Sequence, residues 1–287
     1  MHIIINLNKP PGITSHQAVA RVRRMLGAKK AGHAGTLDPD ACGVLLVCVN
    51  EATKITRFLM DMDKEYRAEI KIGERTDTFD ASGKITETKS ILHISETDLR
   101  NTVGTFEGAV IQKAPMYSAV KIGGETLYKL ARKGIEIDRP DRSVHIHEIK
   151  ITSVNLPFFQ ATISCSKGTY IRSLCDDIGT KLGTGAHMTR LERTAVGPFH
   201  LGNSVSFDDL PGKEFLSFSI DEALKKLPQI TLAGGDYQQA LNGVRISSDS
   251  YRLFNGAFIR MKDPEGKLFA IGRVESDTLK VERILHV

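Results

Sequence analysis

Residues 32–45 of the chain are Gly-His-Ala-Gly-Thr-Leu-Asp-Pro-Asp-Ala-Cys-Gly-Val-Leu, and the charge pattern of the sequence changes inside this stretch. Asp38 is the first acidic residue of the chain. The basic residues that precede it are Lys9, Arg21, Arg23, Arg24, Lys29 and Lys30. Surface segments usually mix both signs of charge, so this order predicts a basic surface with a single carboxylate placed in it.

A positive charge within a few Å of an aspartate favours the ionised form and lowers its pKa by about 1–3 units. We therefore expect Asp38 to be an anion, able to act as a nucleophile or base in a site that attracts polyanions. The glycines and Pro39 shape a loop around it, and the apolar run at residues 44–49 predicts a buried strand. An ordinary turn, with Asp38 bonded to its own backbone, fits the same residues.

The composition is that of an ordinary globular protein. A length of 287 residues, with 41% hydrophobic and 25% charged residues, favours two domains. The net charge of +5 is compatible with a nucleic acid partner but does not demonstrate one. The four cysteines show no C-x-x-C pair and no zinc spacing, so we expect no disulfide, no metal and a cytoplasmic location. We also expect no membrane span and no signal peptide.

Hydrophobic periodicity predicts helices and strands along the chain. The expected strands cover residues 3–7, 44–49, 66–72, 144–147 and 161–165, and the expected helices cover residues 14–27, 55–59, 95–103, 128–133 and 169–182. Tyr66 begins the apolar face of its strand, which predicts a buried ring with the hydroxyl at the rim. His145 and His147 share one face of a strand, and without further ligands nearby they are interpreted as solvent-facing.

The last of these helices carries an arginine at an unusual position. With Thr169 as the N-cap, Arg172 lies in the first turn and off the apolar stripe. The helix macrodipole disfavours a cation at that end. We therefore expect a specific acidic partner, for which Asp38 is the candidate. The alternative is a surface pair with Asp176 one turn later, worth roughly 0.2–0.5 kcal/mol.

A domain boundary is expected near Leu227-Pro228. Short β-like runs separated by glycine-containing turns follow it, which predicts a small β-rich module over residues 228–287. Residues 1–227 then form the larger domain.

Several motifs resemble those of the TruB family of tRNA pseudouridine synthases. Residues 32–45 match the family's catalytic motif, G-H-x-G-T-L-D-P-x-A-x-G-V-L, at every fixed position. The other matches are Lys9-Pro10-Pro11-Gly12-Ile13-Thr14-Ser15, Lys64-Glu65-Tyr66, the loop from Arg75 to Gly83, Ser166 to Arg172, and Leu191-Glu192-Arg193-Thr194. The chain departs from the family at Asn8, where the family more often has Asp.

The resemblance implies roles for individual residues. It implies that Asp38 is the catalytic aspartate, that Arg172 pairs with it, and that Tyr66 stacks on the target base and handles its C5 proton. The residues that the resemblance places around the substrate are Lys9 in the floor, His33 inserted into the RNA loop, Leu191 in the wall of the base pocket, and Asp80 and Tyr170.

The resemblance also implies an α+β pseudouridine synthase fold, with a mixed, mostly antiparallel central sheet flanked by helices. An RNA-gripping insertion is expected at about residues 114–142, and the C-terminal module is expected to be a PUA-like RNA-binding domain. The implied reaction converts uridine 55 in the T loop of tRNA to pseudouridine by base flipping, glycosidic bond cleavage and rejoining through C5. We expect a monomer that needs no cofactor and no guide RNA.

Three other functions are compatible with this sequence. A tRNA-binding or folding module with secondary catalysis would not need a buried pair of Asp38 and Arg172. A pseudouridine synthase for another RNA, guided or not, would keep the pair, although the insertion favours stand-alone recognition. A hydrolase that uses Asp38 as a base would release free uracil.

Overall fold

The protein, seen in a computed structural model that describes residues 1–118, 120–135, 137–210, 215–247 and 254–286, contains two main sheets. The order along the ten-stranded sheet is β14 (Phe218–Ser219), β1 (Ile3–Lys9), β3 (Cys42–Val49), β12 (Ala186–Val196), β4 (Lys64–Ile72), β11 (Phe158–Cys165), β10 (Asp141–Asn155) and β7 (Gly108–Lys113). Two short strands, β2 (Ala31–His33) and β13 (Phe199–His200), pair with β3 and β12. Only the pairing of β3 with β12 is parallel among the described strands of this sheet, which confirms the expected mixed, mostly antiparallel sheet.

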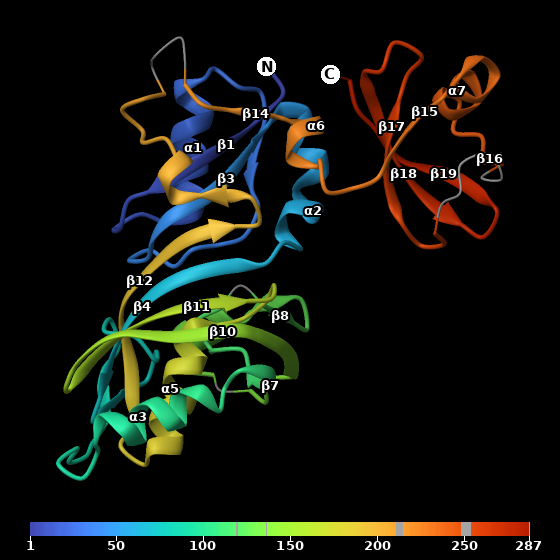
Figure 1. Cartoon of the computed structure of the whole chain (residues 1–287). Coiled ribbons are helices and arrows are strands. Elements are labelled where there is room, and N and C mark those ends of the chain that lie inside the picture. The colour runs from blue at the N-terminus through green and yellow to red at the C-terminus, as the bar shows by residue number, and fades with distance from the viewer. Residues whose placement is uncertain (119, 136, 211–214, 248–253, 287) are drawn as a thin grey trace.

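Helices flank this sheet on both halves. The helical elements are α1 (Ser15–Met25), η1 (Asn50–Ile55), α2 (Thr56–Met60), α3 (Glu96–Gly104), α4 (Leu127–Arg132), α5 (Ile171–Leu182), η2 (Leu201–Asn203), α6 (Ile220–Ala223) and α7 (Gly234–Leu241). In Figure 1, α1 lies beside the half that contains β1 and β3, and α3 and α5 lie beside the half that contains β10 and β11. Among the described residues, no helix has the length and apolar character needed to cross a membrane.

Helix starts follow the predicted caps in two cases and differ in one. Thr14 and Ser95 each accept a hydrogen bond from the third residue of their helix and complete a capping box. The prediction of Thr169 as the cap of α5 was wrong, because Tyr170 is the N-cap. The Thr169 hydroxyl instead donates to the carbonyl of Ser166 at 2.9 Å, which closes the turn that precedes the helix.

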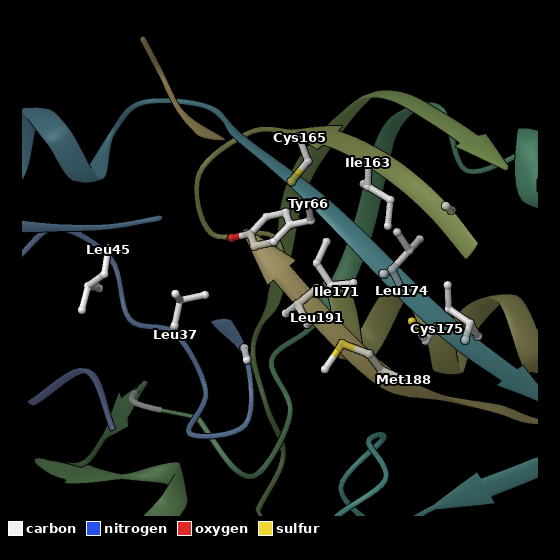
Figure 2. Close-up of a cluster of buried hydrophobic side chains, with 14 of the residues drawn as sticks. Leu37, Leu45, Tyr66, Ile163, Cys165, Ile171, Leu174, Cys175, Met188 and Leu191 are labelled. Atoms are coloured by element: carbon white, nitrogen blue, oxygen red, sulfur yellow. The ribbon is translucent and has the colours of Figure 1, made fainter. Parts of the chain in front are cut away.

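The core of the large domain forms where β4 and α5 face one another. Alternation along β4 buries Tyr66, Ala68, Ile70 and Ile72, as expected of a strand with one buried face. Figure 2 shows the Tyr66 ring at one end of this cluster, with residues of α5 and β12 packed below it. The catalytic candidates therefore lie at the edge of a packed core, which holds them rigidly.

The second sheet lies in the C-terminal part of the chain. Its order is β15 (Gln229–Thr231), β17 (Phe258–Lys262), β18 (Leu268–Glu275), β19 (Thr278–Ile284) and β16 (Ile246–Ser247). Among the short β-like runs expected after Leu227-Pro228, β16 is only a two-residue pairing, and α7, which was not expected, precedes it. Leu268, Ile271 and Leu285 share a buried cluster with residues of β1 and β3. Because the two sheets share this cluster, the domain boundary near Leu227 stays a prediction.

The expected insertion contains a small hairpin and a helix. Strands β8 (Lys121–Ile122) and β9 (Glu125–Thr126) pair with each other, and α4 follows directly. The guanidinium of Arg132 lies 4.9 Å from the ring centre of Tyr128, and Tyr128 packs edge-on against Tyr117. The helix expected at residues 128–133 is therefore present as α4, and it carries the basic residues Lys129 and Arg132. Residues 119 and 136 lie outside the described part of the insertion.

Two further hairpin strands, β5 (Glu74–Thr76) and β6 (Ile85–Thr88), pair with each other after β4. The loop between them, residues 77–84, reaches β12 through the backbone. Ala81 donates to the Met188 carbonyl at 2.9 Å, and Met188 donates to the Phe79 carbonyl at 3.0 Å. This pairing fixes the position of Asp80, which lies between the two bonded residues.

Gly43, the second residue of β3, has a positive φ of 97°. A Cβ at this position would lie 2.3 Å from the carbonyl oxygen of Arg193 in the neighbouring strand. We expect Gly43→Ala to lower the free energy of unfolding by about 2–5 kcal/mol, the sum of the left-handed backbone cost and overpacking. Urea denaturation measures the change. The control is Gly104→Ala at the end of α3, where φ is not positive and the Cβ would meet nothing within 4 Å; an equal loss there would contradict the explanation.

Candidate active site

Asp38 and Arg172 form a two-bond ion pair between the 32–45 loop and the first turn of α5. The Nε of Arg172 lies 2.9 Å from Oδ2 of Asp38, and Nη2 lies 3.1 Å from Oδ1. The Arg172 side chain is 6% exposed, whereas the Asp38 side chain is 35% exposed. The predicted pairing is confirmed, and the carboxylate keeps an open side towards solvent.

The remaining donors of Arg172 are also occupied. Its guanidinium donates to the carbonyl of Thr78 at 3.3 Å and to that of Tyr117 at 2.8 Å, and its Nη1 lies 3.4 Å from the Asp80 carboxylate. Three chain segments therefore converge on one guanidinium, which lets it orient Asp38 with little freedom.

The alternative pairing of Arg172 with Asp176 is wrong. Both carboxylate oxygens of Asp176 are taken by Arg75, at 2.6 and 2.8 Å. Arg75 reaches α5 from β5, next to the loop that carries Asp80. Two successive turns of α5 are thus tied to the same hairpin by two arginine–aspartate pairs.

The predicted direction of the Asp38 pKa shift was wrong. Burial raises the pKa of the Asp38 carboxyl above its ordinary value, and the nearby charge of Asp80 acts in the same direction. Arg172 and Lys9 oppose this change but do not outweigh burial. The sequence argument counted the cations and omitted the loss of hydration, which is the largest contribution.

Lys9 and Ser15 hold the backbone on either side of Asp38. The Lys9 ammonium donates to the carbonyls of Pro10, Ile13 and Pro39 at 2.9, 2.8 and 3.0 Å. Lys9 is fully buried, and burial lowers its pKa to about 8. The Ser15 hydroxyl accepts from the Leu37 amide at 2.8 Å and donates to the Leu37 carbonyl at 3.0 Å. Lys9 thus supports the loop that carries Asp38, whereas its place in the floor of a substrate site stays a prediction, and Ser15 adds a support that was not singled out.

Arg193 is a buried support that the sequence analysis quoted only within a motif. It is 1% exposed and donates to three carbonyls, those of Val44 at 2.7 Å, Gly35 at 3.0 Å and Thr36 at 3.3 Å. It has no carboxylate partner among the described residues. Its strand position pairs with Tyr66 of β4. The available signal was an arginine two residues after Leu191, on the inward face of an alternating strand.

Tyr66 and Leu191 lie on the neighbouring strands β4 and β12. Each is 8% exposed, and the position of Leu191 in β12 pairs with Ala68, two residues after Tyr66. Figure 2 shows the Tyr66 hydroxyl on the side of the ring that faces Leu37, away from Ile163 and Leu174. Burial raises the pKa of this hydroxyl, and the Arg193 guanidinium, which hydrogen-bonds to it, opposes that change.

His33 and Tyr170 lie next to different parts of the sheet, His33 in β2 beside β3 and Tyr170 beside β7. His33 ends β2, and its Nδ1 is buried without a hydrogen-bond partner among the described residues. Burial, with smaller contributions from Arg193 and His16, lowers the His33 pKa, which favours a neutral ring. Tyr170 is fixed through its backbone, which exchanges two bonds with the Gln112 amide at 3.1 and 3.3 Å. Contact of either residue with substrate stays a prediction.

No metal site is evident in the part of the chain that the structure describes. Its His, Cys, Asp and Glu side chains form no group of three or more able to hold a metal ion. His145 and His147 are exposed, with ring centres 5.0 Å apart, and His147 lies 3.4 Å from Asp63.

A cavity of about 410 Å³ lies away from Asp38, between α2, α6 and Phe258.

Comparison with known families gives two adjacent matches. Residues 23–171 match the description "TruB family pseudouridylate synthase (N terminal domain)", and residues 172–227 match "tRNA pseudouridylate synthase B C-terminal domain". Among curated proteins, tRNA pseudouridine synthase B of Clostridium tetani is 41% identical to this chain, over 99% of this chain and 100% of that protein.

Solved structures give the same fold. A chain from the structure of an H/ACA RNP bound to a substrate RNA containing 2′-deoxyuridine superposes with a TM-score of 0.76 at 24% identity, and the match covers 99% of this chain and 85% of that one. A chain from a Cbf5-Nop10-Gar1 complex superposes with a TM-score of 0.75 at 26% identity, over 98% and 84%. The implied pseudouridine synthase fold is confirmed.

Proposed function

Since the chain belongs to the TruB family of tRNA pseudouridine synthases and isomerises uridine in tRNA, we propose that Asp38 is its catalytic carboxylate and uridine 55 of the T loop its target. The observation that carries this proposal is the two-bond ion pair of Asp38 and Arg172 beside Tyr66. A protein that only bound RNA would have no need of an oriented, partly desolvated carboxylate at the end of a packed core.

The reaction breaks the N1–C1′ bond, turns the uracil and forms a C5–C1′ bond. One proton leaves C5 and N1 gains one, so the overall change is an isomerisation. Asp38 acts as an anion next to the sugar or the base, and Arg172 holds its two oxygens in a fixed direction. The open side of Asp38 is the side from which a nucleotide enters.

The detached uracil must be retained while it turns. Tyr66 and Leu191 enclose it, and Tyr66 is the candidate for handling the C5 proton. Such an enclosed site requires the nucleotide to be flipped out of its stack, which costs a few kcal/mol. His33, neutral because its pKa is lowered, enters the space that the flipped nucleotide leaves.

The surrounding segments complete the recognition of tRNA. The insertion at residues 114–142 brings Tyr117 to Arg172 and carries the basic helix α4, so it is suited to grip the RNA without a guide. The five-stranded C-terminal sheet acts as the PUA-like RNA-binding domain. The protein works as a cytoplasmic monomer, and its own side chains supply all the chemistry.

The direct test is to map pseudouridine in an unmodified tRNA transcript after incubation with the purified protein and no additives. We expect complete conversion at uridine 55 and none elsewhere. A transcript with cytidine at position 55 is the matched control and should stay unmodified. Conversion at another position would refute the proposed target, and release of free uracil would refute isomerisation.

A further inference from the structure

The C-terminal end of α1 carries a group of basic side chains without acidic partners. We define the α1 basic patch as Arg23, Arg24, Lys29 and Lys30. All four side chains are exposed, and none forms an ion pair within the described residues. The segment from Met1 to Leu37 contains no Asp or Glu, so the charge of the patch is not balanced from within its own element.

The acidic residues on elements next to α1 and β2 already bond to other groups. Glu51 follows Asn50, whose side chain and amide bond to the backbone of Lys30. The Glu51 carboxylate accepts from the Lys54 ammonium at 2.6 Å and from the His286 amide at 3.0 Å. Asp209, near the ring on which Arg21 lies, accepts from Ser206.

The backbone holds the patch rigidly. The amides of Gly27 and Ala28 return to the carbonyls of Arg24 and Arg23 at 3.2 and 3.0 Å, which folds the loop back on the helix end. The bonds between Lys30 and Asn50 fix the other end of the loop. A preorganised cluster loses little conformational entropy when it binds an anion.

A structural role at the helix end explains only part of this charge. Cations near a helix C-terminus balance a macrodipole of about half an elementary charge. Four unpaired cations exceed that requirement several times over, and their mutual repulsion disfavours the folded state. A polyanionic partner would remove this repulsion.

The position of the patch relative to Asp38 defines where the partner lies. Ser15, the first residue of α1, bonds to Leu37 next to Asp38. The 11 residues of α1 extend about 16 Å from there. For an RNA stem that runs along α1, with a rise of about 3 Å per base pair, this distance corresponds to about five base pairs from the flipped nucleotide.

We propose that the α1 basic patch binds backbone phosphates of the RNA duplex stem that adjoins the target loop, about five base pairs from the flipped uridine. This inference rests on the proposed function for the position of the uridine. Phosphate contacts fix register and orientation without reading sequence. The patch therefore fixes the position of the stem relative to the active site.

The test measures the salt dependence of binding with two double variants, Arg23→Gln/Arg24→Gln and Lys29→Gln/Lys30→Gln. The probe is an RNA hairpin with the target uridine in its loop and a stem of about five base pairs. Each lost phosphate contact lowers the slope of log K against log salt by about 0.9, so each double variant should lose about 1.8. The single-turnover rate at saturating RNA should stay unchanged.

A second hairpin separates direct contact from other causes. In it, the stem phosphates farthest from the loop are neutral methylphosphonates. We expect the salt slope of the native protein to be smaller on this hairpin than on the unmodified one. The double variants should show the same small slope on this hairpin as the native protein. The control pair is Lys225→Gln/Lys226→Gln after α6, outside the insertion, where both side chains are exposed and form no ion pair within the described residues.

Two results would overturn the inference. An unchanged salt slope in both double variants would show that the patch does not meet phosphates. If the double variants lost as much salt slope on the neutralised stem as on the unmodified stem, the patch would contact phosphates elsewhere in the RNA. Since binding is measured whether or not pseudouridine forms, a failure of the proposed reaction is seen separately, by mapping the loop uridine.

Discussion

An Asp38→Asn protein is expected to bind tRNA with nearly native affinity and to form no pseudouridine. Asparagine has almost the same shape and can still accept a bond from Arg172, so the ion pair is replaced by a weaker contact in the same place. It carries no negative charge and cannot attack or take a proton. We expect the single-turnover rate to fall by a factor of about 10⁴ or more.

The matched control is Asp40→Asn, which removes a carboxylate two residues away. Asp40 is exposed and forms no ion pair with a described residue, so we expect its rate and its affinity to stay within about twofold of native, as for surface substitutions that lie away from such features. Quench-flow measurement of pseudouridine with saturating enzyme gives the rate, and filter binding gives the affinity. Native turnover by the Asp38→Asn protein would disprove the assignment of Asp38.

The parts of the fold that depend on local patterns could be predicted from the sequence. The period of two in β4 indicated which face is buried, and Thr14 and Ser95 indicated where two helices begin. The pairing of Asp38 with Arg172 came from an electrostatic argument about a single residue in a helix N-terminal turn. The strand period and the helix caps lie within a few residues of the feature that they predict, whereas Asp38 lies 134 residues before Arg172.

The supports of the site could not be predicted in the same way. Arg193 donates to Gly35 and Thr36, more than 150 residues earlier in the chain, and Ser15 bonds to Leu37 across a separate element. The contacts of Arg193 exist because β12 lies parallel to β3, and no local pattern reports that pairing. An arginine in a sequence is predicted to be buried only if the buried face of its strand is known beforehand.

The pKa of Asp38 shows the same limit. Its cations could be counted in the sequence, but its burial and its distance from Asp80 follow from tertiary structure. The loop that carries Asp80 is fixed by bonds to Met188. A sum over charges therefore gave the wrong direction, because the desolvation of a carboxylate competes with the attraction of a single guanidinium.

The competing contributions to the Asp38 pKa predict opposite effects for its two charged neighbours. Activity requires the Asp38 anion, so the rate rises as the pH increases through the pKa of that carboxyl. Arg172 lowers this pKa, and Arg172→Met should move the acid limb of the rate profile to higher pH. Asp80 raises it, and Asp80→Asn should move the acid limb to lower pH.

Arg172→Lys should also be impaired, because an ammonium keeps the charge but cannot hold both oxygens of Asp38 while meeting Thr78 and Tyr117. We expect a loss of about 10²–10³-fold in the rate at neutral pH, with a smaller shift of the acid limb than in Arg172→Met. Single-turnover rates measured across pH 5–9 give both quantities.

Arg75→Lys provides the control, since it breaks the other two-bond arginine–aspartate pair of α5, at Asp176. That substitution should lower the stability of the protein by a similar amount, yet leave the acid limb in place, because Arg75 does not act on Asp38. A shift of equal size in Arg75→Lys would mean that loosening α5, and not the charge beside Asp38, determines the profile. A profile unmoved by Arg172→Met would show that the guanidinium does not control the ionisation of the catalytic carboxylate.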